Sequence, residues 1–326
     1  MKKTILVTGG SGFIGTNFID LLENKSCSIR NLDINEPKNT EHLRYFERVD
    51  INNYESLLSA MKDFQPDYVV HLAARTDLNG ADLDSYLSNT IGVENIARCC
   101  KELPGIKRLI LASTKLIAPT DAQVSDLTSY NPNTIYGESK ALGEKIIESN
   151  QYLDNWIIVR PTSIWGPWSL GENQPYGKFF QIIKKGLYIH PAVVDQPKYF
   201  GYVENSCFQI YSLLVESPDD VLKKKFYLAD YEIYDIKSWA NLISAAFGRS
   251  SVRVLPKIFV FMAAYAGDFL KFLGYHSPPF SSFRLKNMMA NTTKVPLTSI
   301  KKFVPNLPFN LNDGVKRTVT WINEND

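Results

Sequence analysis

Strand-like and helix-like segments alternate along the first 160 residues, and this order constrains the fold more than any other feature. Short β-rich runs at 4–8, 28–33, 68–72, 108–112 and 156–160 are separated by helical patterns at 12–23, 54–64, 83–103 and 135–149. Strands that alternate with helices form βαβ units around a parallel sheet. The strands are almost entirely apolar, as in a sheet covered on both faces. The sequence therefore predicts an α/β fold with a doubly wound parallel sheet.

A glycine-rich loop, T-G-G-S-G-F-I-G at 8–15, joins the first expected strand to the first expected helix. Its glycines stand at Gly9, Gly12 and Gly15, and Phe13 and Ile14 open the helix. Glycine permits a tight turn and lets the backbone approach a pyrophosphate, while the helix N-terminus offers unpaired N–H groups. Between a strand and a helix, this pattern indicates the dinucleotide site of a Rossmann domain.

Acidic residues at the ends of the next strands extend this site. Asp33 ends the second strand, and its carboxylate can accept hydrogen bonds from ribose hydroxyls. The same charge repels the 2′-phosphate of NADP, so NAD is the expected cofactor. Arg30 and Lys38 lie nearby, and they leave NADP open as a less favoured cofactor. Asp50 and Ile51 follow at the next strand end, where they are expected to flank the adenine.

Tyr136 and Lys140 stand four residues apart in Y-G-E-S-K, on one face of the expected helix 135–149. A tyrosine with its ordinary pKa of about 10 is a poor base at neutral pH. A neighbouring ammonium group lowers that pKa. The pair is therefore a candidate for proton transfer to or from a substrate oxygen.

The second half of the chain has a different character. After residue 160 turn residues become frequent, which predicts a Rossmann domain at 1–160 and, at 161–326, mainly a substrate-binding lobe with segments returning to the sheet. Residues 256–273 form an apolar helical pattern. We expect this helix in the core of the lobe or at a subunit interface; the alternative is a surface that touches membrane or a greasy substrate.

Composition excludes several other classes of protein. The 326 residues suggest about two domains, and the net charge of +2 argues against a nucleic-acid partner. The four cysteines show neither metal-binding nor disulfide spacing, which favours a reducing compartment. No apolar run is long enough for a signal peptide or a membrane span. The expected location is the cytoplasm, with no metal and no integral membrane segment.

Several motifs occur together in an order typical of one family. They are TGGSGFIG, Asp33, Asp50, HLAA at 71–74, Ser113-Thr114, YGESK at 136–140 and Arg160-Pro161. Together they resemble the extended short-chain dehydrogenase/reductase family, in its NAD-dependent epimerase/dehydratase group. The resemblance implies that Thr114 binds the reacting oxygen, that Tyr136 is the acid/base, and that Lys140 binds the nicotinamide ribose. It also implies that the cofactor site includes Leu72, Ala73, Ala74, Asn89 and Pro161.

The resemblance limits the set of possible reactions but does not identify a single one. Dehydratases of the family carry Asp-Glu after the catalytic Thr, whereas this chain has Lys115-Leu116, so 4,6-dehydration is not expected. We expect an NAD-dependent nucleotide-sugar epimerase or 4-ketoreductase, acting in surface-polysaccharide precursor synthesis. One alternative is a dehydrogenase of an apolar or sterol-like alcohol, since 313–322 (DGVKRTVTWI) also resembles the ending of hydroxysteroid dehydrogenases. A non-catalytic NAD(H)-sensing protein is another.

The substrate side and the assembly are also expectations by resemblance. Relatives commonly pair through helices matching 82–103 and 135–149, which implies a homodimer. Trp168 is a further residue that could stack on a base or sugar. The candidate substrate residues are Arg75, Ser113, Ser163, Trp165, Lys198 and Arg284.

Overall fold

A seven-stranded parallel sheet forms the centre of the protein in the part that the structure describes. The computed structural model describes residues 2–118, 127–150, 153–169, 175–193, 197–275, 281–282, 285, 289 and 295–325. The strand order is β10-β6-β5-β4-β1-β2-β3, and every neighbouring pair is parallel. The strands are β1 (Thr4–Thr8), β2 (Ser28–Asp33), β3 (Phe46–Arg48), β4 (Tyr68–His71), β5 (Arg108–Ala112), β6 (Trp156–Pro161) and β10 (Lys224–Leu228).

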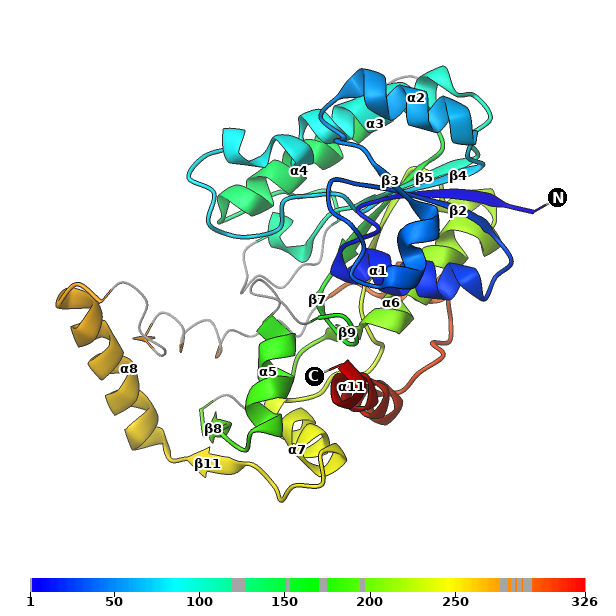
Figure 1. Ribbon diagram of the computed structural model, residues 1–326. Coiled ribbons are helices and arrows are strands. Elements are labelled where there is room, and N and C mark those ends of the chain that lie inside the picture. The colour runs from blue at the N-terminus through cyan, green and yellow to red at the C-terminus, as the bar shows by residue number, and fades with distance from the viewer. Residues whose placement is uncertain are drawn as a thin grey trace.

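Helices cover both faces of the sheet, as Figure 1 shows. One face carries α2 (Tyr54–Phe64), α3 (Ile91–Glu102) and α4 (Ile135–Ser149), and the other carries α1 (Phe13–Glu23) and α6 (Val203–Tyr211). Successive strand residues point to opposite faces. Thus Ile5 and Val7 belong to the core beneath α1 and α6, whereas Leu6 belongs to the core beneath α2 and α3. The doubly wound sheet predicted from the sequence is confirmed.

The chain beyond β6 contributes both to the sheet and to a smaller group of elements. β10 pairs with β6 and extends the sheet. Two small parallel pairs join β7 (Ser163–Trp165) to β9 (Phe200–Tyr202) and β8 (Ile189–Pro191) to β11 (Arg253–Leu255). The accompanying helices are α5 (Pro175–Lys184), α7 (Ile236–Ala246), α8 (Lys257–Phe272), α10 (Thr298–Phe303) and α11 (Leu311–Asn325). The domain boundary at residue 160 stays a prediction.

Two expectations about helices are wrong in detail. The segment expected as one helix over 83–103 is a 3-10 turn, Asp84–Asn89, followed by α3. Tyr86 leaves helical geometry because its buried hydroxyl donates to the carbonyl of Asp77 and accepts from the amide of Gly80. α8 is a helix as predicted, but most of its large side chains are exposed, so its expected place in the core of the lobe is wrong, whereas the expected subunit interface stays a prediction. Among the helices of the described residues, none combines the length and the apolar character needed to cross a bilayer.

Candidate active site

The site begins where the strand order reverses, between β1 and β4. Open α/β sheets bind ligands at such a point, outside the carboxyl ends of the strands. The loop after β1 touches the loop after β4 there: Gly9 has a φ of +73°, and a Cβ on it would lie 2.4 Å from the amide nitrogen of Ala73. A Cβ on Gly15 would lie 2.3 Å from the carbonyl oxygen of Gly9. Only glycine fits these positions, so the loop turns tightly onto the start of α1.

Asp33 lies beside this loop at the end of β2. Its carboxylate accepts hydrogen bonds from the backbone N–H groups of Ser11 (3.1 Å) and Asn35 (3.0 Å). Burial raises the pKa of the Asp33 carboxyl above its ordinary value, although these amides oppose the shift. A carboxylate fixed next to the glycine turn is the arrangement that binds the adenosine ribose of a dinucleotide. The residues present therefore fit NAD.

Thr114 and Tyr136 meet because α4 begins directly on the turn that follows β5. The Thr134 side chain caps α4 by accepting the N–H of Gly137 at 3.0 Å. A Cβ on Gly137 would lie 2.2 Å from the carbonyl oxygen of Leu116, so glycine allows this close approach. The Thr114 side chain lies close enough to the Tyr136 hydroxyl to lower the pKa of that phenol, and both residues are buried. The structure thus brings two of the predicted catalytic residues into contact.

Lys140 follows Tyr136 by one helical turn and is also buried. Burial lowers the pKa of the Lys140 ammonium to about 8, opposed by the charge of Glu144. Burial also raises the pKa of Tyr136 to about 12, opposed by the nearby Thr114 side chain. A buried phenol and a buried amine on one helix face respond strongly to a ligand's charge, because little water screens them.

The burial of the Lys140 ammonium leads to a prediction about the stability of the folded protein. Lys140→Met should raise the free energy of unfolding at pH 7 by up to about 3 kcal/mol, because a pKa of about 8 against 10.5 for the ordinary lysine penalises the charged folded form. Between pH 8 and 10.5 the unfolded wild type binds more protons at this lysine than the folded form, so wild-type stability rises with pH there. The advantage of the variant should therefore shrink through that window.

Urea unfolding at several pH values measures this difference. Lys145→Met, at an exposed position on the same helix, is the matched control and should change stability little at any pH. Equal stability of wild type and Lys140→Met at pH 7 would contradict a desolvated ammonium at Lys140.

Asn89 is a buried residue that supports the active site through hydrogen bonds. Its side-chain amide donates to the carbonyl of Arg75 and to the hydroxyl of Ser139, and its oxygen accepts the N–H of Arg75. Ser139 in turn donates to the carbonyl of Tyr136. Asn89 is fully buried, so these contacts make it a residue that ties the loop after β4 to α4.

The other expected cofactor residues lie at strand ends. Leu72, Ala73 and Ala74 follow β4 and are half-buried, and Pro161 ends β6. Asp50 is exposed, and its carboxylate accepts the N–H of Asn52. Ile51 differs from its expected role because its side chain is buried in the core beneath α2 and α3.

The structure separates the candidate substrate residues into different groups. Arg75 is committed within its own loop: its guanidinium donates to both oxygens of Asp77 and to the carbonyl of Ser85. This pairing favours a structural role over anion binding. Ser113 is buried beside Thr114, and its Oγ has no hydrogen-bond partner within the described residues. Arg284 lies outside the described residues.

Ser163 and Lys198 lie in the small elements after β6. Ser163 is half-buried, and its side chain lies close enough to Tyr176 to lower the pKa of that phenol against the effect of burial. The backbone of Lys198 pairs with that of Tyr234, and burial lowers the pKa of the Lys198 ammonium. Both remain candidates for contact with substrate.

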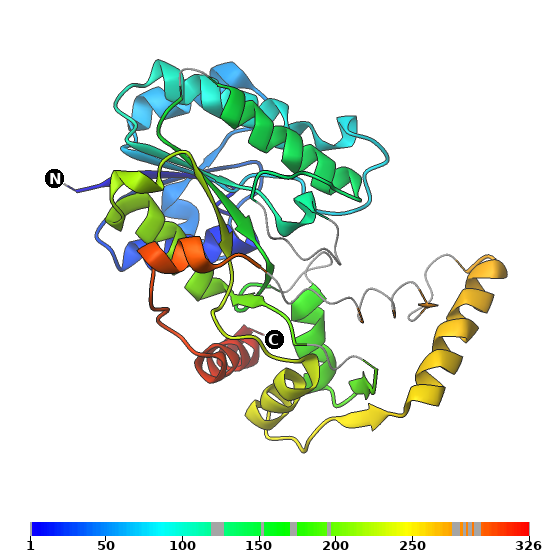
Figure 2. The same ribbon diagram turned by 180° about the vertical axis from the view of Figure 1, so that it is seen from behind.

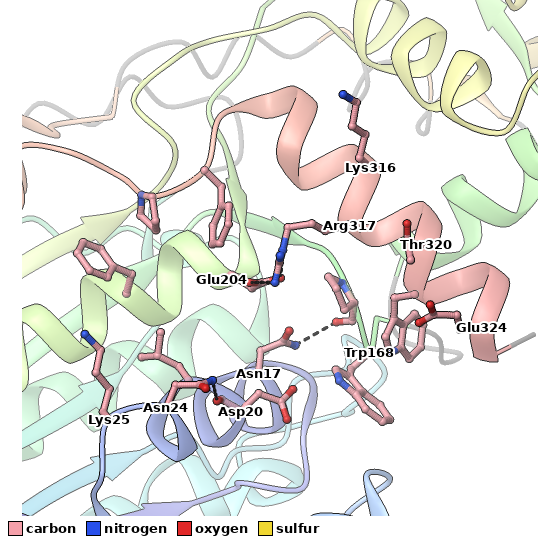
Figure 3. A pocket seen from close by; sticks show the side chains of 16 residues that line it. Asn17, Asp20, Asn24, Lys25, Trp168, Glu204, Lys316, Arg317, Thr320 and Glu324 are labelled. Carbon is pink, nitrogen blue, oxygen red and sulfur yellow. Dashed lines mark hydrogen bonds and ion pairs between the residues drawn. The ribbon is translucent and has the colours of Figure 1, made fainter.

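The expectation that Trp165 contacts substrate is wrong. Trp165 is fully buried, stacks on Phe180 and donates its indole N–H to the hydroxyl of Tyr234 at 2.8 Å. Trp168 packs on Trp321 (ring centroids 5.1 Å apart) in a separate pocket of about 760 Å³ between α1, α6 and α11 (Figure 3). An ion pair between Glu204 and Arg317 crosses that pocket, and its lining contains no residue of the Thr114–Tyr136–Lys140 group.

Two site residues were not selected from the sequence. The ring of Tyr86 packs against that of Tyr136, with centroids 6.2 Å apart. Lys115 follows Thr114, and burial together with the charge of Lys198 lowers its pKa to about 8. In the sequence, the position of Lys115 directly after Thr114 was the feature that could have identified it as a site residue.

A doubly wound parallel sheet with a glycine turn after β1 and an acid at the end of β2 defines a dinucleotide-binding protein. The chain belongs to the NAD dependent epimerase/dehydratase family, whose family model matches residues 5–217. It is therefore an enzyme of an NAD-dependent family, and NAD is its cofactor.

Several characterised proteins are similar to this chain. A GDP-6-deoxy-D-talose 4-dehydrogenase of Aggregatibacter actinomycetemcomitans is 32% identical over 219 residues, which cover 64% of this chain and 69% of that protein. A UDP-glucuronate 4-epimerase of Thermodesulfobacterium geofontis is 23% identical and covers 98% and 96% of the two chains. In fold, a UDP-glucose 4-epimerase of Thermotoga maritima solved with UDP-glucose superposes with a TM-score of 0.76 over 99% of both chains at 19% identity.

Proposed function

We propose that the protein is an NAD-dependent nucleotide-sugar epimerase or 4-ketoreductase that serves the synthesis of surface-polysaccharide precursors. The observation that carries this proposal is the buried neighbourhood of Thr114 and Tyr136, one turn from Lys140, on a helix that Asn89 ties to the loop packed against the dinucleotide turn. Relatives named as a GDP-6-deoxy-D-talose 4-dehydrogenase and as UDP-sugar 4-epimerases support a nucleotide sugar as substrate and C4 as the reacting position.

In the proposed mechanism, Tyr136 exchanges the proton and NAD, when bound, supplies the redox partner. The Thr114 hydroxyl holds the reacting oxygen next to the Tyr136 hydroxyl. In oxidation, the phenolate of Tyr136 takes the proton of the substrate hydroxyl; in reduction, the phenol returns it to the carbonyl oxygen. The ammonium of Lys140 stabilises the phenolate and can bind the nicotinamide ribose.

Lys115 bears on the choice of reaction and substrate. The dehydratases that this chain resembles carry Asp-Glu at the position of Lys115-Leu116, so the acid/base pair that the resemblance links to water elimination is replaced here. Lys115 and Lys198 together favour an anionic or strongly polar substrate. This supports a nucleotide sugar over an apolar alcohol and argues against 4,6-dehydration.

NMR of a panel of UDP-, GDP- and dTDP-sugars, incubated with enzyme and a catalytic trace of NAD, tests the proposal. A new epimer without net change in NAD would establish an epimerase. In a parallel incubation with excess NAD, a 4-keto product formed with an equal amount of NADH would establish the dehydrogenase direction. Turnover of a sterol alcohol, with every nucleotide sugar unchanged, would overturn the proposal in favour of the apolar-alcohol alternative.

Asp33 should set the choice between NAD and NADP. Asp33→Ala should weaken NAD binding by about 10- to 100-fold, since a charged hydrogen-bond acceptor contributes about 1.5–3 kcal/mol. NADP binding should be unchanged or tighter, because the carboxylate no longer repels the 2′-phosphate. Calorimetric titration with each dinucleotide measures both changes.

The exposed Glu36 provides the matched control for this experiment. Glu36→Ala removes the same charge from the same loop and should leave the preference for NAD intact. If both variants shift the two affinities equally, the effect is general electrostatics and Asp33 does not select the cofactor.

The remaining expectations belong to this proposal as well. A Rossmann domain ending at residue 160 would hold the cofactor, and the lobe after it would hold the sugar nucleotide. A homodimer would form through helices α3 and α4, and the enzyme would act in the cytoplasm.

A further inference from the structure

α8 and the residues directly after it expose an unusual amount of apolar surface. Phe272 is 85% exposed, Tyr265 68% and Ile258 65%. Monomeric proteins rarely expose contiguous apolar patches of this kind without a partner. In both ribbon views the helix lies at the edge of the molecule, away from the sheet (Figures 1 and 2). The other large exposed side chains of this apolar face are Phe259, Phe261, Met262, Phe269, Leu270 and Leu273.

The exposed side chains share one side of the helix. At 100° per residue, Ile258, Met262, Tyr265 and Phe269 form its centre, and the apolar face spans ~180° of the circumference. The opposite side is buried at Val260, Ala264 and Gly267, where it packs on Leu285. α8 is therefore held to the protein by small residues and presents its bulky residues outward.

The charges of α8 lie away from the apolar face. The same helical geometry places Lys257, Asp268 and Lys271 on the half that faces the protein. Arg253 precedes the helix in β11, so three cations accompany one acid. The Asp268 carboxylate accepts the N–H of Ser282, which ties the acid to the protein. The charge bordering the apolar face is therefore net positive.

We propose that α8 inserts its apolar face into the surface of an anionic lipid bilayer. An interfacial helix has one apolar face with aromatic residues and has lysine or arginine at its polar side. The 16 residues of α8 are about 24 Å long, shorter than the hydrocarbon core of about 30 Å, so the helix lies in the plane of the interface. Lys257 and Lys271, on the polar side, would lie at the level of the headgroups.

The width of the apolar face favours a lipid surface over a second copy of the chain. A surface helix that packs against protein has an apolar stripe of about 100° or more, and a contact of that minimum width would leave the edges of the ~180° face in water. A bilayer surface covers the whole face at once. The flanking cations also fit anionic headgroups, whereas the same cations in two copies would repel each other across a symmetric contact.

Vesicle flotation of the full-length protein tests this proposal. With vesicles of equal parts phosphatidylglycerol and phosphatidylcholine, the protein should float, and binding should weaken with phosphatidylcholine alone or at 0.5 M salt. Phe269→Ser/Phe272→Ser should lower the partition coefficient at least about tenfold. Leu78→Ser/Leu187→Ser removes two exposed leucines elsewhere and should leave the partition coefficient unchanged.

A second variant keeps the test independent of the stability of the serine variants. In Phe269→Trp, the tryptophan emission should shift to the blue on addition of the anionic vesicles, and brominated lipid should quench it. An emission unchanged by vesicles, or flotation of the double serine variant equal to wild type, would overturn the proposal. So would a dimer in sedimentation that the double variant loses while wild type fails to float. None of these outcomes depends on the sugar chemistry proposed above.

Discussion

Tyr136→Phe should lower kcat by about 10²- to 10⁴-fold and leave NAD affinity within about twofold. The change removes only the hydroxyl that contacts Thr114, and positioned proton transfer contributes about this much to catalysis. The ring keeps its packing against Tyr86, so the fold and the dinucleotide turn should persist. Steady-state assays with the substrate found by NMR, together with calorimetric titration of NAD, measure the two effects separately.

The pH dependence gives this prediction a second readout. In the direction of oxidation Tyr136 acts as the phenolate, so the rate should rise with pH until the phenol is ionised. Burial places the pKa of Tyr136 at about 12 in the protein without cofactor, and a bound cation near it lowers that value. The variant should lose this limb of the profile.

Tyr54→Phe is the matched control for Tyr136→Phe. Its hydroxyl is hydrogen-bonded to Glu102 on the surface of α2 and α3, so turnover should stay at the wild-type level. Activity of Tyr136→Phe above a tenth of wild type would remove Tyr136 from the role of acid/base.

Local sequence signals predicted the parts of this protein that local geometry determines. Gly9 has the positive φ of the turn, Gly15 is required by a close backbone contact within that turn, and Tyr136 and Lys140 share a face because of helical spacing alone. Asp33 follows from the end of a strand. These features depend mainly on residues that are close in the chain, so a short stretch of sequence is enough to predict them.

The missed or incorrect predictions depend on partners that periodicity does not reveal. Trp165 is buried by aromatic rings from distant segments, and its N–H is satisfied by Tyr234. Arg75 carries a free charge in the sequence but pairs with Asp77 once the loop folds. The apolar pattern of α8 predicted a helix correctly, but apolar composition does not say whether protein, lipid or water faces it.

The buried ion pair between Glu144 and Arg160 shows how such distant contacts support the site. Glu144 lies one turn beyond Lys140 on the same face of α4, and Arg160 lies on β6. The guanidinium donates to both carboxylate oxygens, at 2.9 and 2.6 Å, and both side chains are fully buried. Tyr130 also donates to Glu144, and Lys225 lies 4.0 Å from it. Glu144 thus balances buried positive charge from two other elements.

Glu144→Ala should therefore lower the free energy of unfolding by about 3–5 kcal/mol, because it leaves the Arg160 charge buried without a partner. Asp154→Ala breaks the exposed pair with Lys223 and should cost at most about 1 kcal/mol. In urea unfolding, Glu144→Leu/Arg160→Met should recover most of the loss, since it removes both charges. If the double variant is as unstable as Glu144→Ala, the cause is a cavity and the uncompensated charge is not responsible.

Glu144→Ala should also change the active site, because the charge of Glu144 acts on Lys140. The charge of Glu144 raises the pKa of the Lys140 ammonium and so opposes the effect of burial. Without that charge, the pKa of Lys140 should fall from about 8 to a lower value. Lys140 would then lose its proton nearer neutral pH, and the stabilisation of the Tyr136 phenolate would be lost with it. At temperatures where the variant stays folded, its activity should fall with rising pH at lower pH values than in wild type. Glu148→Ala, on the same helix, also removes a carboxylate bonded to Tyr130 and Lys225 and should leave this pH dependence unchanged.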